Sequence, residues 1–363
     1  MSVAMNAAMN VNEGQRPAHE SPQFRDGKFR NASPPKKPGG WQLAKLWWQF
    51  LFKDQSRTVP PRQLSVSPLT PEQLRQAPEG SIYRLGHSTV LMKLNGNFWM
   101  TDPVFSERAS PVQWFGPKRF MPTPISLADL PPLAAVVLSH DHFDHLDRDT
   151  VIALAARTSM FLAPLGVGDQ LVRWGIPAEK TRQLDWWQTV EVEGIQFTAT
   201  PAQHFSGRSM FADNPTLWAS WSIYTGNHRI FFSGDSGYFD GFAEIGQRHG
   251  PFDLTLLEAG AYDKRWEGVH MLPEQVMQAH RDLRGDWLLP IHNATFDLAF
   301  HAWDEPMEKM LSLSAQQGIR LTMPRIGEAV RLGDCHAAQP WWRCKHARPA
   351  NVGATATHMP LET

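Results

Sequence analysis

The sequence predicts an α/β fold in which buried strands end in polar loops. Its 363 residues are 42% hydrophobic and 20% charged, which allows an ample core in one large domain or two small ones. The apolar run 134–138 is typical of a buried strand, and a cluster of histidines and aspartates follows it directly. Other short apolar runs end on a histidine or an aspartate in the same way. We therefore expect the strand ends to carry the chemistry of this protein.

Charge and cysteine content exclude several classes of protein. The formal net charge of −1 gives no basic field, so we expect no nucleic-acid partner. Cys335 and Cys344 are the two cysteines, so no disulfide framework supports the fold, and a reducing compartment, the cytoplasm, is expected. Together with His336 and His346 they have the residue types of a small zinc knuckle. Their spacing is loose, and a metal site there is the less favoured interpretation.

The N-terminal region divides at residue 41. Residues 1–40 are rich in Asn, Pro, Ala and Lys and lack an apolar core segment and a secretory signal pattern, so we expect a disordered leader. In 41–53 the polar residues lie three or four apart and leave a wide aromatic face, which predicts an amphipathic helix, followed by a linker to residue 80. This helix is too short to span a bilayer. Either it packs on the protein itself, or it lies at the inner face of the cytoplasmic membrane as a peripheral contact, with Trp47 and Trp48 inserted.

Regular strands are expected from residue 81 on. Residues 81–94 alternate into a hairpin through Asn95-Gly96, a strong turn signal, and 97–100 return as the next strand. Asp102 follows that strand, and its carboxylate either caps the loop or supports the polar cluster. His87 lies inside the hairpin, and we expect it to have a structural role or to support the cluster.

The segment 139–147 combines three imidazoles with several carboxylates. Side chains alternate in an extended segment, so His140 and His142 can point to one side and hold a single ion. Asp144 and His145 follow a bend and are placed to hold a second ion beside the first. Imidazole nitrogen together with carboxylate oxygen suits zinc, or iron or manganese, better than calcium or magnesium. We therefore predict two Zn²⁺ ions, with Fe or Mn as alternatives.

Three later apolar runs supply the remaining ligands of a dinuclear site. The histidine or aspartate that follows each run, taken alone, is more often a core or loop residue than a ligand. The predicted set is His140, His142 and His204 for one ion, Asp144, His145 and His292 for the other, and Asp235 as the bridge. Such a set leaves an open position for water, which is typical of a catalytic metal site. The reaction expected is hydrolysis by attack of a hydroxide that bridges the two ions.

The motif His140-Asp141-His142-Phe143-Asp144-His145, followed in order by His204, Asp235 and His292, resembles the metallo-β-lactamase superfamily. The resemblance implies a four-layer αββα sandwich with the metals at one edge of its two sheets. It further implies a hydrolase domain over 81–333, with one sheet from about 81–192 and the other from about 193–332. The residues after it, 334–363, form a polar tail.

Within the superfamily the sequence is more similar to the N-acyl-phosphatidylethanolamine-hydrolysing phospholipases D. The likeness runs from about 41 to 327 and includes Thr101-Asp102-Pro103 and Gly234-Asp235-Ser236-Gly237-Tyr238. It implies a phospholipid substrate, cleaved to phosphatidic acid and an N-acylethanolamine, and the family allows a homodimer. The chain has His292-Asn293-Ala294-Thr295-Phe296 where the family usually has His-Trp-Gly-Thr-Phe, and its loop before His270 is shorter. We expect metal binding to be retained despite these sequence differences, and the preference for acyl chain and head group to change.

Further residues are candidates for contact with the substrate. His270 matches a histidine that the family requires near the scissile phosphate, so we expect it to join Asp144 and Asp235 as a catalytic residue and to protonate the leaving group. Its alternative role is structural, at the start of a helix. Arg208 and Arg265 are candidates for bidentate phosphate contacts, although exposed arginines are usually only solvated. Tyr262 is a candidate for the acyl groove, although aromatic residues more often lie in the core.

Two rival hypotheses accompany this prediction. In the first, the same dinuclear site serves a soluble metallohydrolase, a lactonase or small phosphodiesterase, which would act without vesicles. In the second, the chain is a membrane-surface or scaffolding protein whose metal site is structural. The open coordination positions expected at the metals argue against the second rival.

Overall fold

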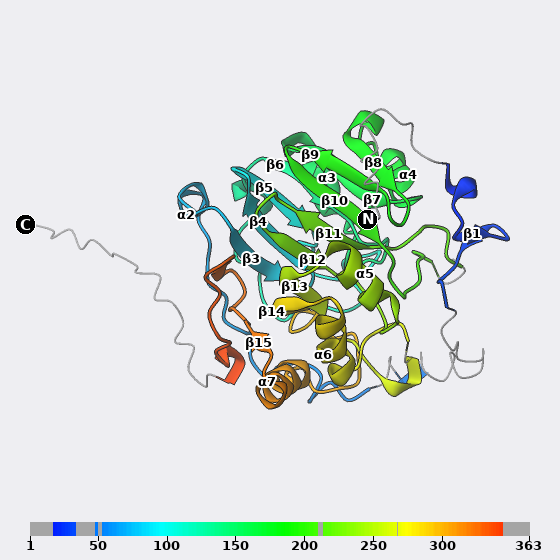
Figure 1. The fold of residues 1–363 in the computed structure, drawn as a ribbon. Helices are drawn as coiled ribbons and strands as arrows, with labels where there is room; N and C mark the ends of the chain where they lie inside the picture. The colour runs from blue at the N-terminus through cyan, green and yellow to red at the C-terminus, as the bar shows by residue number, and fades with distance from the viewer. Residues whose placement is uncertain (1–16, 34–47, 50–52, 210–212, 267, 344–363) are drawn as a thin grey trace, which may run out of the picture.

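The computed structural model describes residues 17–33, 48–49, 53–209, 213–266 and 268–343. Two mixed seven-stranded sheets face each other, and helices cover the outer face of each sheet (Figure 1). This arrangement confirms the expected four-layer αββα sandwich. Within the described ranges, no helix has the length and the apolar character that crossing a membrane requires.

The first sheet has the strand order β16-β3-β4-β5-β6-β7-β8. Its strands are β3 (Ser81–Gly86), β4 (Thr89–Leu94), β5 (Asn97–Thr101), β6 (Leu133–Val137), β7 (Thr158–Pro164), β8 (Thr181–Leu184) and β16 (Ala329–Arg331). The hairpin through Asn95-Gly96 is confirmed: both residues have positive φ, at 50° and 75°, as a two-residue turn that matches the twist of the strands requires.

The second sheet has the order β15-β14-β13-β12-β11-β10-β9. Its strands are β9 (Thr189–Val192), β10 (Ile195–Thr200), β11 (Ser220–Tyr224), β12 (Arg229–Phe232), β13 (Phe252–Glu258), β14 (Gly285–Ile291) and β15 (Arg320–Leu321). The expected division of the chain, with residues 81–192 in one sheet and 193–332 in the other, is wrong for two strands. β9 forms a hairpin with β10 and so joins the second sheet, whereas β16 returns to pair with β3 in the first.

Three apolar layers hold the sandwich together. The central layer lies between the sheets, and two outer layers lie under the helices. In β6, Val136 faces the outer layer while Ala135 and Val137 face the other sheet, so the strand is apolar on both sides. The helices are α2 (Pro71–Arg75), α3 (Arg148–Leu154) and α4 (Val167–Arg173) for the first sheet, and α5 (Gly241–His249), α6 (Pro273–Asp282) and α7 (Glu305–Gln317) for the second.

Short 3₁₀ turns complete the described secondary structure. They are η1 (Ala18–Glu20), η2 (Leu127–Asp129), η3 (Ala155–Arg157), η4 (Ala178–Lys180), η5 (Lys264–Trp266) and η6 (Trp341–Arg343). The last of these corrects the expectation of a polar tail for residues 334–343. Trp341 and Trp342 are both buried and pack in the outer layer of the second sheet, and Trp342 donates a hydrogen bond to Glu308.

The expected disordered leader is wrong over residues 17–33. This segment forms the hairpin of β1 (Phe24–Arg25) and β2 (Lys28–Phe29), and Phe29 is fully buried in the central layer. Phe24 packs against it edge to face, with ring centroids 5.0 Å apart. Composition averaged over forty residues hid these two phenylalanines, which supply the burial that holds the segment in place. The rest of the predicted leader lies outside the described residues.

Two other predictions fall partly outside the described residues. Of the predicted helix 41–53, the structure describes 48–49 and 53. Trp48 is exposed, and Lys53 forms a buried ion pair with Asp297. The choice between a membrane contact and packing on the protein therefore stays a prediction. Of the cysteine pair, Cys344 is outside. Cys335 is half-buried, and burial raises the pKa of its thiol to about 11.

Candidate metal centre

Loops from both sheets meet at one edge of the sandwich. β12, β13 and β14 are parallel neighbours, so the chain leaves all three strands at the same edge. Asp235 follows β12, Glu258 ends β13, and His292 follows β14. β10 runs in the same direction, two strands away from β12, and leads to His204. The segment 138–147 comes from β6 of the other sheet, and its backbone is joined to the second sheet by a hydrogen bond from Ala219 N to Ser139 O.

The structure brings the first predicted group together. His140 Nε2 lies 2.9 Å from His142 Nδ1, and His204 Nε2 lies 3.3 Å from the same atom. Asp235 Oδ2 is 3.9 Å from His140 Nε2 and 3.7 Å from His204 Nε2. Ligands of a tetrahedral zinc ion are separated by about 3.3 Å, given bonds of 2.0–2.1 Å. The three imidazole nitrogens therefore have the spacing of ligands around one ion.

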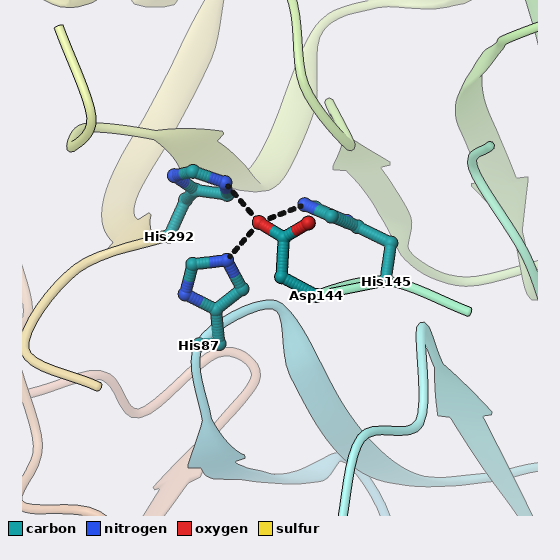
Figure 2. Close-up of side chains that lie close together, drawn as sticks. All are labelled: His87, Asp144, His145 and His292. Carbon is teal, nitrogen blue, oxygen red and sulfur yellow. Dashed lines mark hydrogen bonds and ion pairs between the residues drawn. The ribbon is translucent and has the colours of Figure 1, made fainter. Parts of the chain in front are cut away.

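The second predicted group lies beside the first, around Asp144 (Figure 2). Asp144 Oδ2 is 3.3 Å from His292 Nε2 and 3.6 Å from His145 Nε2. Asp235 reaches this group as well, with Oδ1 3.1 Å from His145 Nε2 and Oδ2 3.1 Å from His292 Nε2. Asp235 thus contacts both groups, which is the position expected of the bridging ligand.

Several ligand atoms in this centre have unmet bonding capacity. His145 Nε2, His292 Nε2 and Asp235 Oδ1 are buried, and although Asp235 lies 3.1 Å from both nitrogens, none of the three atoms makes a well-directed hydrogen bond among the described residues. A buried polar atom without a partner is destabilising, and such atoms in native proteins usually serve a ligand or an ion. Here they converge on one point with the nitrogens and oxygens of the two groups. The buried His and Asp clusters therefore fit a dinuclear metal site.

The protonation of the centre agrees with this assignment. Burial lowers the pKa of His140 and of His204 well below the ordinary value, which favours the neutral imidazole that binds metals. Burial also opposes charge on His292, but the neighbouring Asp235 and Asp144 outweigh it and raise its pKa to about 9. The carboxylates thus favour protonated imidazoles at His292 and His145 where no cation is bound. A metal ion would displace these protons.

Asp102 holds His145 from behind. Its Oδ2 lies 2.6 Å from His145 Nδ1, and its Oδ1 accepts a hydrogen bond from Ser139 N at 2.7 Å. The side chain is fully buried. A carboxylate behind a metal-binding histidine fixes the tautomer and turns the other nitrogen toward the ion. Of the two roles considered for Asp102, the geometry matches support of the cluster.

His87 lies closer to the centre than its predicted supporting role requires. Its Nε2 is 3.0 Å from Asp144 Oδ2, and its ring centroid is 4.0 Å from that of His292 (Figure 2). Burial lowers its pKa to about 3, so the ring is neutral. Its backbone N–H donates to Thr295 Oγ1 at 2.6 Å, which ties the tip of the β3–β4 hairpin to the His292 loop. His87 therefore positions Asp144 and lies within ligand reach of the second group.

Sequence reasoning missed Glu258, which pairs with His270. The carboxylate is fully buried, its Oε2 lies 3.0 Å from His270 Nδ1, and its Oε1 accepts a hydrogen bond from Met271 N. The His270 ring is 5.2 Å from that of His204 and 5.3 Å from that of His292. Burial raises the pKa of Glu258. Glu258 stands at the end of an apolar run, which is the same pattern that predicted His204, Asp235 and His292.

The three residues predicted to contact the substrate each have partners within the protein. Arg208 Nη1 donates to the carbonyls of Asp141 and Leu146, both at 2.7 Å, so its guanidinium supports the metal-binding loop, and a contact with phosphate stays a prediction. Arg265 forms a two-point ion pair with Asp263. Tyr262 is buried and donates its hydroxyl to Glu305 at 3.0 Å. The sequence could not show these partners, because each depends on tertiary contacts or on local loop geometry.

A pocket opens directly beside His292. Its cavity volume is about 20 Å³, which is room for about one water molecule, and polar and apolar side chains both line it. His292 and Asn293 contribute the end nearest the metal centre, and Phe296, His301 and Trp303 contribute to the rest. A substrate held at the metal centre would have this pocket as its neighbour.

Comparisons with known proteins agree with this geometry. A family model described as "Beta-lactamase superfamily domain" matches residues 99–293. An uncharacterized protein of Mycobacterium tuberculosis is 41% identical over 334 residues, 90% of this chain and 88% of that protein. The N-acyl-phosphatidylethanolamine-hydrolyzing phospholipase D 1 of Caenorhabditis elegans is 36% identical over 242 residues, 63% of this chain and 68% of that protein. The solved structure of a metallo hydrolase from Ignicoccus hospitalis has a similar fold, with a TM-score of 0.53 at 20% identity, over 69% of this chain and 97% of that one.

Proposed function

Because this chain belongs to the metallo-β-lactamase superfamily and is a metal-dependent hydrolase, we propose that its substrate is N-acyl-phosphatidylethanolamine. Hydrolysis of the phosphodiester on the ethanolamine side would release phosphatidic acid and an N-acylethanolamine. The similarity to the phospholipase of Caenorhabditis elegans supports this choice of substrate. The proposal includes a cytoplasmic protein that meets the lipid at the membrane surface.

The observation that carries the proposal is the placement of the His270–Glu258 pair beside the shared carboxylate. Glu258 accepts at His270 Nδ1, which leaves Nε2 as the nitrogen available to a substrate. The ring adjoins both histidine groups, through His204 and His292. A leaving alkoxide needs a proton, and an imidazole fixed by a buried carboxylate can deliver one there. Phosphodiester hydrolysis would therefore use both the two ligand groups and the His270–Glu258 pair beside them.

The remaining residues of the centre would hold the metal ions or orient the side chains that bind them. His140, His142 and His204 would hold one metal ion, and Asp144, His145 and His292 the other. When bound, the ions supply Lewis acidity toward a phosphoryl oxygen and lower the pKa of a coordinated water. Asp102 fixes the tautomer of His145, and Arg208 braces the loop that carries four of these ligands.

Hydrolysis of N-acyl-phosphatidylethanolamine vesicles by the purified protein tests the proposal. The same assay is run with a water-soluble phosphodiester and with two variants, Asp144→Asn in the centre and Asp149→Asn on the exposed face of α3 as the matched control. We expect the parent and the control to cleave the lipid and Asp144→Asn to lose at least a hundredfold. Cleavage of the soluble ester alone would overturn the lipid assignment and favour a soluble lactonase or small phosphodiesterase.

A further inference from the structure

Four large aromatic side chains of the described residues are exposed at the edge of the sandwich that carries the metal centre. We call them the aromatic rim, which consists of Trp48 (66% exposed), Trp114 (81%), Phe115 (57%) and Phe205 (43%). Resting on the proposed function, we propose that the aromatic rim docks this edge on the surface of an anionic phospholipid bilayer. The rim would then place the metal centre against the layer that contains the proposed substrate.

Two members of the rim lie at the tip of an arm formed by residues 104–120, and both roots of this arm lie at the metal edge. At the first root, Phe105 N donates a hydrogen bond to Asp147 Oδ2, in the segment that carries four predicted metal ligands, at 3.2 Å. At the second root, Phe120 N donates to Thr295 O, in the loop that follows β14, at 2.8 Å. The arm therefore projects from the loops that form the metal centre.

The tip of the arm pairs several of its own polar groups. The two legs meet in a bridge between Arg108 and Lys118. The Arg108 guanidinium donates to the carbonyls of Gln113 at 3.1 Å and Gly116 at 2.5 Å, and the Gln113 side chain donates to Arg108 O at 3.1 Å. Backbone groups that enter an apolar layer must be paired within the protein. The tip can therefore approach lipid without leaving these carbonyls unpaired.

The same tip carries two neighbouring aromatic rings. Trp114 and Phe115 are adjacent in the chain, and their ring centroids lie 6.1 Å apart. Single exposed apolar residues are common on proteins, but exposed apolar side chains that gather in one place indicate an interaction site. Tryptophan and phenylalanine are typical of segments that insert at the boundary between lipid headgroups and acyl chains. A lipid surface therefore suits this tip.

The other two members of the rim lie on separate segments of the same edge. The ring of Phe205 lies 4.6 Å from that of His142, a predicted metal ligand. Trp48 precedes Gln49, whose Oε1 accepts a hydrogen bond from Arg265 Nη1 at 3.0 Å. Arg265 lies in the loop that leaves β13 at the metal edge. Three segments that are far apart in the chain thus present aromatic side chains around the metal centre.

The charge of the arm favours an anionic surface. Residues 104–120 contain three basic side chains, those of Arg108, Lys118 and Arg119, and one acidic side chain, that of Glu107. N-acylation removes the ammonium of phosphatidylethanolamine and leaves its phosphodiester negative, so a bilayer that contains the proposed substrate is anionic. Basic residues close to such a surface strengthen binding. The aromatic and the electrostatic contributions therefore favour the same partner.

The position of the rim favours a bilayer over a protein partner. A protein docked on the rim would cover the metal centre, which the proposed substrate must reach. A bilayer would instead bring the phosphodiester to the edge where the metal ligands lie. The exposed rings also come from three separate segments, which suits several shallow insertions into lipid.

Sedimentation with vesicles that contain no substrate tests this inference without hydrolysis. The vesicles are phosphatidylcholine alone and phosphatidylcholine mixed with phosphatidylglycerol. The metal-loaded parent is compared with Trp114→Ser/Phe115→Ser, and with the control Ile152→Ser/Val172→Ser, which removes two exposed aliphatic side chains from α3 and α4. We expect the arm variant to bind the mixed vesicles at least about tenfold more weakly than the parent, and the control to stay within about twofold. The parent should prefer the mixed vesicles, and high salt should remove that preference.

Several results would overturn the inference. They are no binding by the parent, equal binding by the parent and the folded arm variant, and an equal loss in the control. Sedimentation velocity without vesicles provides a further check, because a dimer that the arm variant abolishes would assign the rim to an interface between two copies of the chain. Metal content and melting temperature report whether each variant folds. If the arm variant does not fold, Trp48→Ser carries the test, with an expected loss of about threefold or more.

The two proposals fail separately. If the parent protein cleaves N-acyl-phosphatidylethanolamine but the arm variant binds vesicles as the parent does, the docking surface falls and the substrate stands. If the parent binds vesicles through the arm but does not cleave the lipid, the docking surface stands and the proposed reaction falls.

Discussion

Asp102 accepts a hydrogen bond from His145, with Oδ2 2.6 Å from Nδ1, and the carboxylate is fully buried behind the ring. This contact joins the end of β5 to the segment that follows β6. It fixes which nitrogen of His145 points toward Asp235, and so links the fold of the first sheet to the second histidine group.

Loss of the Asp102–His145 contact should lower the affinity for the metal ion at the second position, which is the one formed by Asp144, His145 and His292. Asp102→Asn replaces an acceptor by a group that can donate to the ring, which favours the wrong tautomer of His145. We expect metal affinity at that position to fall by about 10–100-fold, while the three-histidine position keeps its ion. Metal titration followed by calorimetry measures both steps. Two unchanged binding steps in a folded variant would show that Asp102 does not position His145.

His270 should affect turnover more than metal binding. His270→Gln removes the proposed proton donor, and we expect turnover of the lipid to fall by about 10²–10⁴-fold with the metal content unchanged. Glu258→Gln should produce a smaller loss and a shifted pH profile, because it releases Nδ1 without removing the ring. Steady-state kinetics on vesicles, with kcat and KM separated, provide the measurement. Unaltered kcat in His270→Gln would exclude the ring from the proton transfer.

Asn31 should stabilise the loop of His204. Its Nδ2 donates to His204 O at 2.8 Å, and its Oδ1 accepts from His204 N at 3.1 Å. Asn31→Ala leaves two backbone groups of that loop without their partners, and we expect the free energy of unfolding to fall by about 1–3 kcal/mol. Denaturant unfolding measures the loss, with Asn227→Ala in an exposed turn as the control. Equal stability of the two variants would mean that the N-terminal hairpin does not support the metal centre.

His280 should make the fold sensitive to acid. Burial lowers its pKa to about 4 from the ordinary 6.5. Between these values the unfolded chain binds the proton and the folded chain does not, so the free energy of unfolding decreases as the pH falls from 6.5 toward 4 and is at its full value above that window. His280→Gln should remove up to about 3 kcal/mol of this pH-dependent loss, at 1.36 kcal/mol per unit of pKa shift.

Unfolding in urea at a series of pH values measures this effect. His19→Gln, in an exposed turn, serves as the control and should keep the slope of the parent. A parent-like slope in His280→Gln would place the acid sensitivity elsewhere.

The metal centre was the most predictable part of this protein. The ligand-rich segment after β6 is local, so its spacing alone indicated two groups, and the later ligands each follow an apolar run. The structure brings all seven predicted ligands to one edge. The four-layer fold followed from resemblance, because periodicity gives strands but not their order in a sheet.

The contacts between elements were not predictable. The sequence did not show that Arg208 supports the metal-binding loop through its Nη1, which donates to the carbonyls of Asp141 and Leu146. Asn31 was missed because its partner, His204, lies 173 residues away in the chain. Glu258 could have been found at the end of its apolar strand, but its pairing with His270 depends on the fold. The hairpin in residues 17–33 was missed because the burial of Phe29 in the central layer anchors it. The average composition of the N-terminal region does not show the effect of one buried side chain.

Reconstitution of the chelated protein, followed by hydrolysis of N-acyl-phosphatidylethanolamine vesicles, tests the central claim most directly. The rate is measured against equivalents of Zn²⁺ added to the parent and to Asp235→Asn. We expect no activity without metal, a rise that levels off at about two equivalents, and at least a hundredfold lower plateau in the variant, since Asp235 contacts both ligand groups. Full activity in the chelated protein, or a plateau that Asp235→Asn leaves unchanged, would contradict a hydrolase built on two metal ions.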